Sequence, residues 1–229
     1  MPQNLADHLQ NFLSKSSLKQ KKSLNKEQVA TLMHFSYCNA KDLLDEATLL
    51  RQNDKYARAF TLCVLALEEL AKMPIALNAL FFKPNDKTAW DGFWNTLNSH
   101  SYKQNAAKEY GKYIPMKIAD PKRWEAFYKK QIPSELPLNE LKLASIYVDC
   151  YDGTALRPNK VFTDDKGILP IIFDVVKNRL EAWDQFHSTP KLSAEFVETA
   201  IEFNDDLLED SCLDFVTEEF RKRSHKKSK

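Results

Sequence analysis

Apolar residues recur every three or four positions over two long stretches of the chain, which is the spacing of one face of an α-helix. The first stretch predicts a helix over about residues 26–51. The second predicts a helix over about residues 54–82, and the polar segment "RQNDKY" between them predicts a turn. Two long helices joined by so short a turn are expected to form an antiparallel hairpin.

The second predicted helix is apolar on nearly every side, which is typical of a helix at the centre of a bundle. Pro74 lies within this helix and has no N–H to donate to the carbonyl of Leu70. We therefore expect a kink close to Lys72.

Beyond the hairpin, the helical pattern continues in shorter pieces. We find no two alternating runs joined by a two-residue turn, and we expect residues 151–167, "YDGTALRPNKVFTDDKG", to form a loop. The expected fold class is an all-α bundle built on the long hairpin and completed by C-terminal helices. The other segments expected to be helical are "AWDGFWNTLNS", "YKQNAAKEYGKYI", "LNELKLASIYVDC" (with an extended end), "LPIIFDVVKNRLEAWDQFH", "KLSAEFVETAIEFN" and "DLLEDSCLDFVTEEFRK".

A chain of 229 residues suits one large domain. We expect a polar N-terminal extension at residues 1–25, a single helical domain at 26–220 and a disordered basic tail at 221–229. The tail, "RKRSHKKSK", has six Lys or Arg among nine residues. Such a tail is usually solvated, and it is also a candidate for binding nucleic acid.

The overall composition is that of a soluble protein, with a net charge of +1 that demands no nucleic-acid partner for the whole chain. No apolar run reaches the roughly 18–20 residues of a membrane span, and the first residues lack the apolar core of a signal peptide. We therefore expect a cytoplasmic protein. The four cysteines are scattered without zinc-binding spacing, and no nucleotide-binding motif occurs. We expect no cofactor and no metal site.

The segment "LALEELAK" places three charged residues in the apolar second helix, where an unpaired charge is costly. Lys72 lies four residues after Glu68 and three after Glu69, so it can reach either carboxylate. One carboxylate is then left over. It either faces solvent or a second subunit, or it pairs with a group from elsewhere in the fold.

Three elements in this order resemble one known family. They are the helix "YARAFTLCVLALEELAK", the segment "SHSYK" with His100 and Lys103, and "IYVD" at 146–149. Together with "YCNAKDLLDEATLL", they resemble the AbiV abortive-infection family of phage-defence proteins, which is placed in the HEPN superfamily of helical bundles. The similarity covers roughly residues 28–160.

The resemblance implies a metal-independent endoribonuclease that acts as a homodimer on tRNA or ribosomal RNA and responds to a phage-encoded activator. It implies that His100 is the general acid or base and that Lys72 and Lys103 stabilise phosphate charge. It also implies that Glu69 or Glu68 holds Lys72 or His100 in orientation. For binding RNA, the expected residues are Lys103, Arg221, Lys222 and Arg223.

The sequence departs from the superfamily in one respect, because HEPN nucleases usually have an Arg followed by His after four to six residues. Seven residues separate Arg179 from His187, and three separate Arg221 from His225. We expect Arg179 on the surface and His187 at a helix C-terminus. The missing motif favours an alternative, a non-catalytic helical module that blocks translation or senses a phage protein by contact. A helical structural protein without a defence role is a third possibility.

Overall fold

The structure is a computed structural model, and it describes residues 23–108, 131–163 and 167–205. The expected basic tail and most of the expected N-terminal extension lie outside these residues. Within them, the prediction of an all-α fold is confirmed, with one small β-hairpin as the exception.

The long antiparallel hairpin is present as predicted. Helix α2 (Lys26–Gln52) and helix α3 (Tyr56–Asn78) are joined by a short turn in which Asp54 has a positive φ of 55°. Asn25 begins α2 with a capping box, because its side chain accepts the Gln28 N–H while the Gln28 side chain accepts the Asn25 N–H. The predicted boundaries of the first helix agree with α2 to within one residue, and α3 begins two residues later and ends four residues earlier than predicted.

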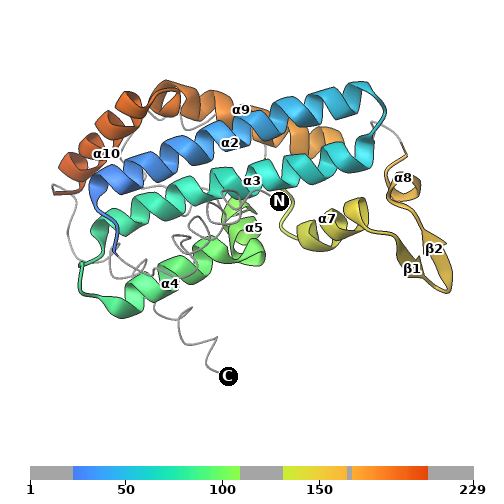
Figure 1. Cartoon of the computed structure of the whole chain (residues 1–229), viewed down its shortest axis with the longest axis horizontal. Helices are drawn as coiled ribbons and strands as arrows, with labels where there is room; N and C mark the ends of the chain where they lie inside the picture. Colours follow the sequence, from blue (N-terminus) through green and yellow to red (C-terminus); the bar gives the residue numbers. More distant parts are fainter. Residues whose placement is uncertain (1–22, 109–130, 164–166, 206–229) are drawn as a thin grey trace, which may run out of the picture.

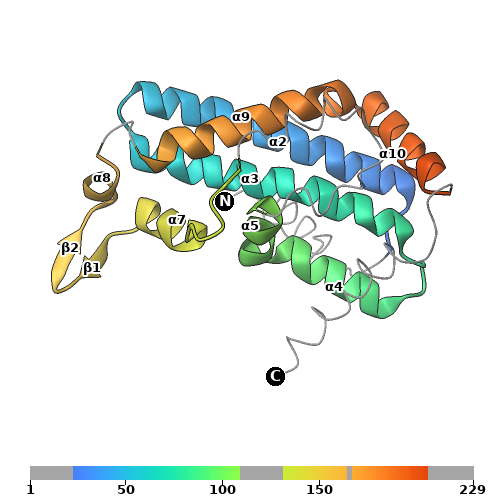
Figure 2. The same ribbon diagram turned by 180° about the vertical axis from the view of Figure 1, so that it is seen from behind.

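Helix α3 lies at the centre of the bundle, as its apolar surface predicts. Figures 1 and 2 show α2 and α9 along one side of α3, and α4, α5 and α7 along the other. Helix α10 packs against α2 and α9. The bounds of these helices are α4 (Lys87–Asn98), α5 (His100–Lys108), α7 (Leu138–Ile146), α9 (Ile168–His187) and α10 (Pro190–Asp205).

Pro74 lies inside α3, and the helix continues past it to Asn78. The Asn78 side chain donates a hydrogen bond of 2.8 Å to the Pro74 carbonyl. A 3-10 turn, η1 (Ala79–Phe81), follows in place of the last residues of the predicted helix. The core around η1 and α4 is aromatic, and Trp90 packs edge-on against both Phe82 and Phe93.

The prediction of a loop at residues 151–167 is wrong where this segment forms strands and a short helix. Strands β1 (Asp149–Tyr151) and β2 (Thr154–Leu156) pair antiparallel. The two residues between them, Asp152 and Gly153, have positive φ angles of 49° and 75°. This is the backbone of a type I′ turn, for which Asp-Gly is a favoured pair. The hairpin projects beyond the end of α7, and the short helix α8 (Pro158–Val161) that follows it contacts α7 and α3 (Figure 1).

Replacing Gly153 with alanine is expected to destabilise this hairpin by about 1 kcal/mol, since an L-residue pays that cost in the left-handed region. No atom lies near enough to clash with the added Cβ, so the cost is conformational. Hydrogen exchange of the β1 and β2 amides should accelerate severalfold, while the global unfolding temperature stays the same. Unchanged exchange at these amides would contradict the turn assignment.

No helix within the described ranges is long and apolar enough to span a membrane.

Candidate functional site

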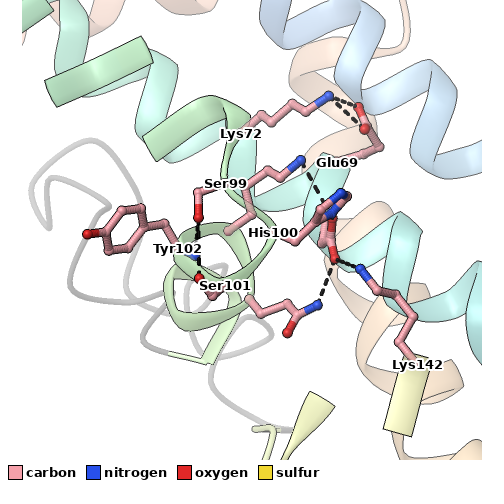
Figure 3. Close-up of polar contacts among 10 residues, drawn as sticks. Glu69, Lys72, Ser99, His100, Ser101, Tyr102 and Lys142 are labelled. Carbon is pink, nitrogen blue, oxygen red and sulfur yellow. Dashed lines mark hydrogen bonds and ion pairs between the residues drawn. The ribbon is translucent and has the colours of Figure 1, made fainter. Parts of the chain in front are cut away.

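A buried carboxylate, Glu68, lies at the centre of a group of polar side chains between α3, α5 and α7. Only 1% of Glu68 is exposed. Its Oε1 accepts hydrogen bonds from Lys142 Nζ at 2.8 Å and from Gln104 Nε2 at 2.7 Å. Its Oε2 pairs with His100 Nδ1 at 2.5 Å and lies 3.5 Å from Lys103 Nζ. We call these five residues the Glu68 cluster (Figure 3).

Helix α5 supplies three members of the cluster because of its periodicity. Lys103 and Gln104 follow His100 by three and four positions, and residues with that spacing from one another share a helix face. Ser99 precedes the helix, and its hydroxyl accepts the Tyr102 N–H at 3.4 Å, as an N-capping residue does. In Figure 3 the Tyr102 side chain points away from His100, so the cluster lies on one side of α5.

Helix α7 supplies the remaining cation, Lys142. The buried positions of this helix are Leu138, Lys142 and Ser145, which form one stripe along it. Ser145 shares a hydrogen bond of 2.6 Å with Thr61 of α3, about two helical turns from Glu68. Two polar contacts thus align α7 on α3.

The other carboxylate of "LALEELAK" forms a separate pair with its neighbour. Lys72 Nζ donates to both oxygens of Glu69, at 2.6 and 2.7 Å. The Glu69 and Lys72 side chains are 15% and 22% exposed, so this pair lies nearer the surface than Glu68. The carboxylate left over by Lys72 is therefore Glu68, and its partners come from α5 and α7.

Electrostatics favour an ionised Glu68. Burial alone would raise its pKa, but hydrogen bonds from Lys142, His100 and Gln104 outweigh burial and hold the pKa below its ordinary value. Burial lowers the pKa of Lys103, and the nearby charge of Lys72 adds to this effect while Glu68 opposes it. The cluster and the Glu69–Lys72 pair together contain three lysines and two glutamates, so positive charge is in excess.

His100 connects this buried charge to solvent. Its side chain is 60% exposed, whereas that of Glu68 is 2% exposed. An ionised carboxylate can only accept, so the proton in the short contact belongs to Nδ1. In the neutral tautomer that donates from Nδ1, Nε2 carries the lone pair, and it has no hydrogen-bond partner among the described residues. This is the arrangement of an imidazole that can accept a proton from a ligand.

Sequence reasoning did not find Lys142 and Gln104. Gln104 lies one turn after His100, and that spacing was the available signal. Lys142 follows the buried Leu138 by four residues, and a lysine in an otherwise buried stripe was the signal there. Neither signal names Glu68 as the partner, which depends on how α5 and α7 dock on α3.

Arg179 and His187 do not join the Glu68 cluster. The expectation of a surface Arg179 is wrong, because only 2% of Arg179 is exposed and its Nη2 donates to the Ala107 carbonyl at 2.7 Å. His187 ends α9 as expected, but it is fully buried and shares a hydrogen bond with Ser193. Burial, with the nearby His34, lowers the pKa of His187 to about 3. These residues support the helix packing.

The expected RNA-binding residues of the tail, Arg221, Lys222 and Arg223, lie outside the described residues, as does His225. Within the described residues, no three His, Cys, Asp or Glu side chains are grouped so that they could hold a metal ion.

A family model for AbiV, of the HEPN type, matches residues 28–181. No curated protein and no solved structure matches the chain. The matched segment is more than half of the 229 residues and includes the whole Glu68 cluster. The chain therefore belongs to the AbiV family of HEPN-type proteins, a family associated with abortive-infection defence.

Proposed function

We propose that this protein is an antiphage abortive-infection effector that cleaves RNA without a metal ion and so arrests host translation and growth. The observation that supports this most is the His100–Glu68 pair. An exposed imidazole is held through Nδ1 by a buried carboxylate, and its Nε2 is available to a ligand. A histidine oriented in this way is suited to move a proton at neutral pH.

The proposed reaction is the attack of a ribose 2′-oxygen on the adjacent phosphorus. His100 Nε2 takes the 2′-hydroxyl proton as the O2′–P bond forms. The P–O5′ bond breaks, the leaving 5′-oxygen takes a proton from water, and His100 gives its proton to the hydroxide that remains. The products are a 2′,3′-cyclic phosphate and a free 5′-hydroxyl, and no metal ion takes part in the proposed reaction.

Excess positive charge beside His100 supports the same reaction. Negative charge builds on the phosphate oxygens in the transition state, and nearby cations stabilise it. Lys72, whose side chain is 22% exposed, is the more accessible cation, and Lys103, whose side chain is 9% exposed, lies deeper. In this proposal, Lys72 meets the phosphate and Lys103 adds positive potential from behind it.

The family resemblance supports the remaining parts of the proposal. The RNA is tRNA or ribosomal RNA, the active form is a homodimer, and a phage-encoded protein is the activator. The basic tail, with Arg221, Lys222 and Arg223, adds phosphate contacts that do not depend on sequence.

The test uses full-length protein, purified both from uninfected and from phage-infected cells, with total RNA in EDTA. We expect cleavage that leaves 2′,3′-cyclic phosphate ends. The matched control is a synthetic RNA with a 2′-O-methyl group at the mapped site, which should resist cleavage because its nucleophile is blocked. If neither preparation cuts RNA, or if the products end in a 3′-hydroxyl, the proposed reaction is wrong.

A second candidate is the non-catalytic module that acts by contact. The observation that favours it is a group of exposed apolar residues at the end of α7 and just beyond it. Leu143, Tyr147 and Val148 are 45%, 61% and 64% exposed. Such a surface is typical of protein-binding sites. This candidate predicts that cells remain protected from phage when His100 is replaced, whereas the nuclease proposal predicts that protection is lost.

A further inference from the structure

We infer that Lys142 is a positioning residue of this site: it provides the counter-charge of Glu68, so that His100 can remain neutral and accept a proton. This inference rests on the proposed function. It concerns a residue far from "LALEELAK" and "SHSYK" in the sequence, on helix α7, whose ion pair with the site is the one from Lys142 to Glu68.

The geometry makes Lys142 the principal cation of Glu68. Its ammonium lies 2.8 Å from Oε1, and the residue is only 5% exposed. Lys103 lies farther away, at 3.5 Å from Oε2, and Gln104 carries no charge. Among the described residues, Lys142 is thus the one lysine within normal hydrogen-bond distance of Glu68.

The burial of Lys142 is energetically unfavourable unless its charge is compensated. Burying a lysine requires desolvating its charge, and the Glu68 carboxylate offsets this. The neighbouring contact, between Ser145 and Thr61, aligns α7 without any charge. Docking of α7 therefore has a second polar contact with α3 that carries no charge. A cation at this position compensates the negative charge of Glu68, which a neutral hydrogen-bond donor does not do.

The chemical consequence concerns His100. If Lys142 were absent, Glu68 would keep only the more distant Lys103 as a cation among the described lysines, and a second proton on the imidazole would be favoured. An imidazolium has no lone pair on Nε2 and cannot act as a base. With Lys142 present, Glu68 is compensated, and its hydrogen bond fixes the proton on Nδ1. The lowered pKa of Glu68, to which Lys142 is the largest contributor among the hydrogen-bond partners, agrees with this view.

The experiment replaces Lys142 with methionine in the full-length protein and measures two quantities. The first is the ring-nitrogen NMR shifts of His100 in ¹⁵N-histidine-labelled protein, assigned with a His100→Gln sample. At neutral pH we expect one protonated ring nitrogen in the wild type and a large increase in the doubly protonated form in K142M. The second is the pH dependence of kcat/KM for RNA cleavage. In K142M the acidic limb of this profile should move to higher pH by about one unit, and kcat/KM should return to near the wild-type value at alkaline pH.

Three further variants separate positioning from simple docking. Ser145→Ala removes the other polar contact of α7 with α3 and should change neither quantity. Lys142→Arg keeps the charge and should restore both. Lys142→Gln keeps a donor but not the charge, so it should behave like K142M, and it replaces K142M if that variant does not fold.

Unchanged His100 shifts in both neutral variants would overturn the inference, and so would a change of equal size in Ser145→Ala. The NMR measurement does not need activity. If the wild type fails to cleave RNA, the proposed function fails, while the ring-nitrogen shifts still decide the role of Lys142.

Discussion

Replacing Glu68 with alanine should lower the free energy of unfolding by about 3–5 kcal/mol at neutral pH, the usual cost of removing one partner from a buried ion pair. The variant leaves the buried ammonium groups of Lys142 and Lys103 without their carboxylate. Gln104 and His100 also lose their acceptor. Urea unfolding followed by circular dichroism measures the difference.

The adjacent carboxylate provides the matched control. Glu69 pairs only with Lys72 among the charged partners described, and both side chains are partly exposed. Replacing Glu69 with alanine should cost about 1 kcal/mol or less, since solvent compensates for a pair near the surface. If both variants lost the same free energy of unfolding, Glu68 would contribute no more to stability than the partly exposed Glu69.

Glu68 also makes the free energy of unfolding depend on pH, and the direction of this dependence can be predicted. The folded-state pKa of Glu68 lies below its ordinary value of 4.5. Its contribution is therefore complete above the unfolded-state pKa and is lost as the pH falls through the folded-state pKa. The Glu68→Gln variant should lose less stability than the wild type over this acidic range. A parallel decline in both proteins would assign the acid sensitivity to other groups.

Replacing His100 with alanine is expected to reduce the rate of RNA cleavage by about 10²–10⁴-fold, which is typical for loss of a general base. Protection of cells against phage should be lost with it. Stability should change little, because the His100 side chain is 60% exposed and Glu68 keeps its bonds from Lys142 and Gln104. A stable but inactive variant is thus expected.

Ser101→Ala is the control for His100, since Ser101 is the next residue of α5 and is exposed but makes no contact with Glu68. Phage plating efficiency and cleavage rate should match the wild type in this variant. Full protection by the His100→Ala protein would favour the contact-only module instead.

The sequence predicts the long hairpin well because the signal is local and repeated many times. Each turn of α2 and α3 places apolar residues on the buried face, so the period is clear over both helices. The β1–β2 hairpin was missed because strands of three residues are too short to show alternation. Its only local signal is the Asp152–Gly153 pair, which we treated as part of a loop.

The same distinction applies to the candidate site. Glu69 and Lys72 are neighbours on one helix, so their spacing alone makes the pair possible. His100 is 32 residues from Glu68, and only the family resemblance suggested it. Lys142 is 74 residues away, and its partner depends on where α7 docks. Arg179 was placed on the surface because charged residues usually lie there, whereas a backbone carbonyl of α5 accepts from it in the interior.

The most direct test of the account is chemical rescue of the His100→Ala protein with free imidazole, measured as RNA cleavage in EDTA. The missing side chain is largely exposed, so imidazole has access to the vacated position. We predict that the variant alone is nearly inactive, and that added imidazole restores part of the rate with 2′,3′-cyclic phosphate products. A variant that cleaves RNA at the wild-type rate without imidazole would contradict the claim that His100 moves the proton.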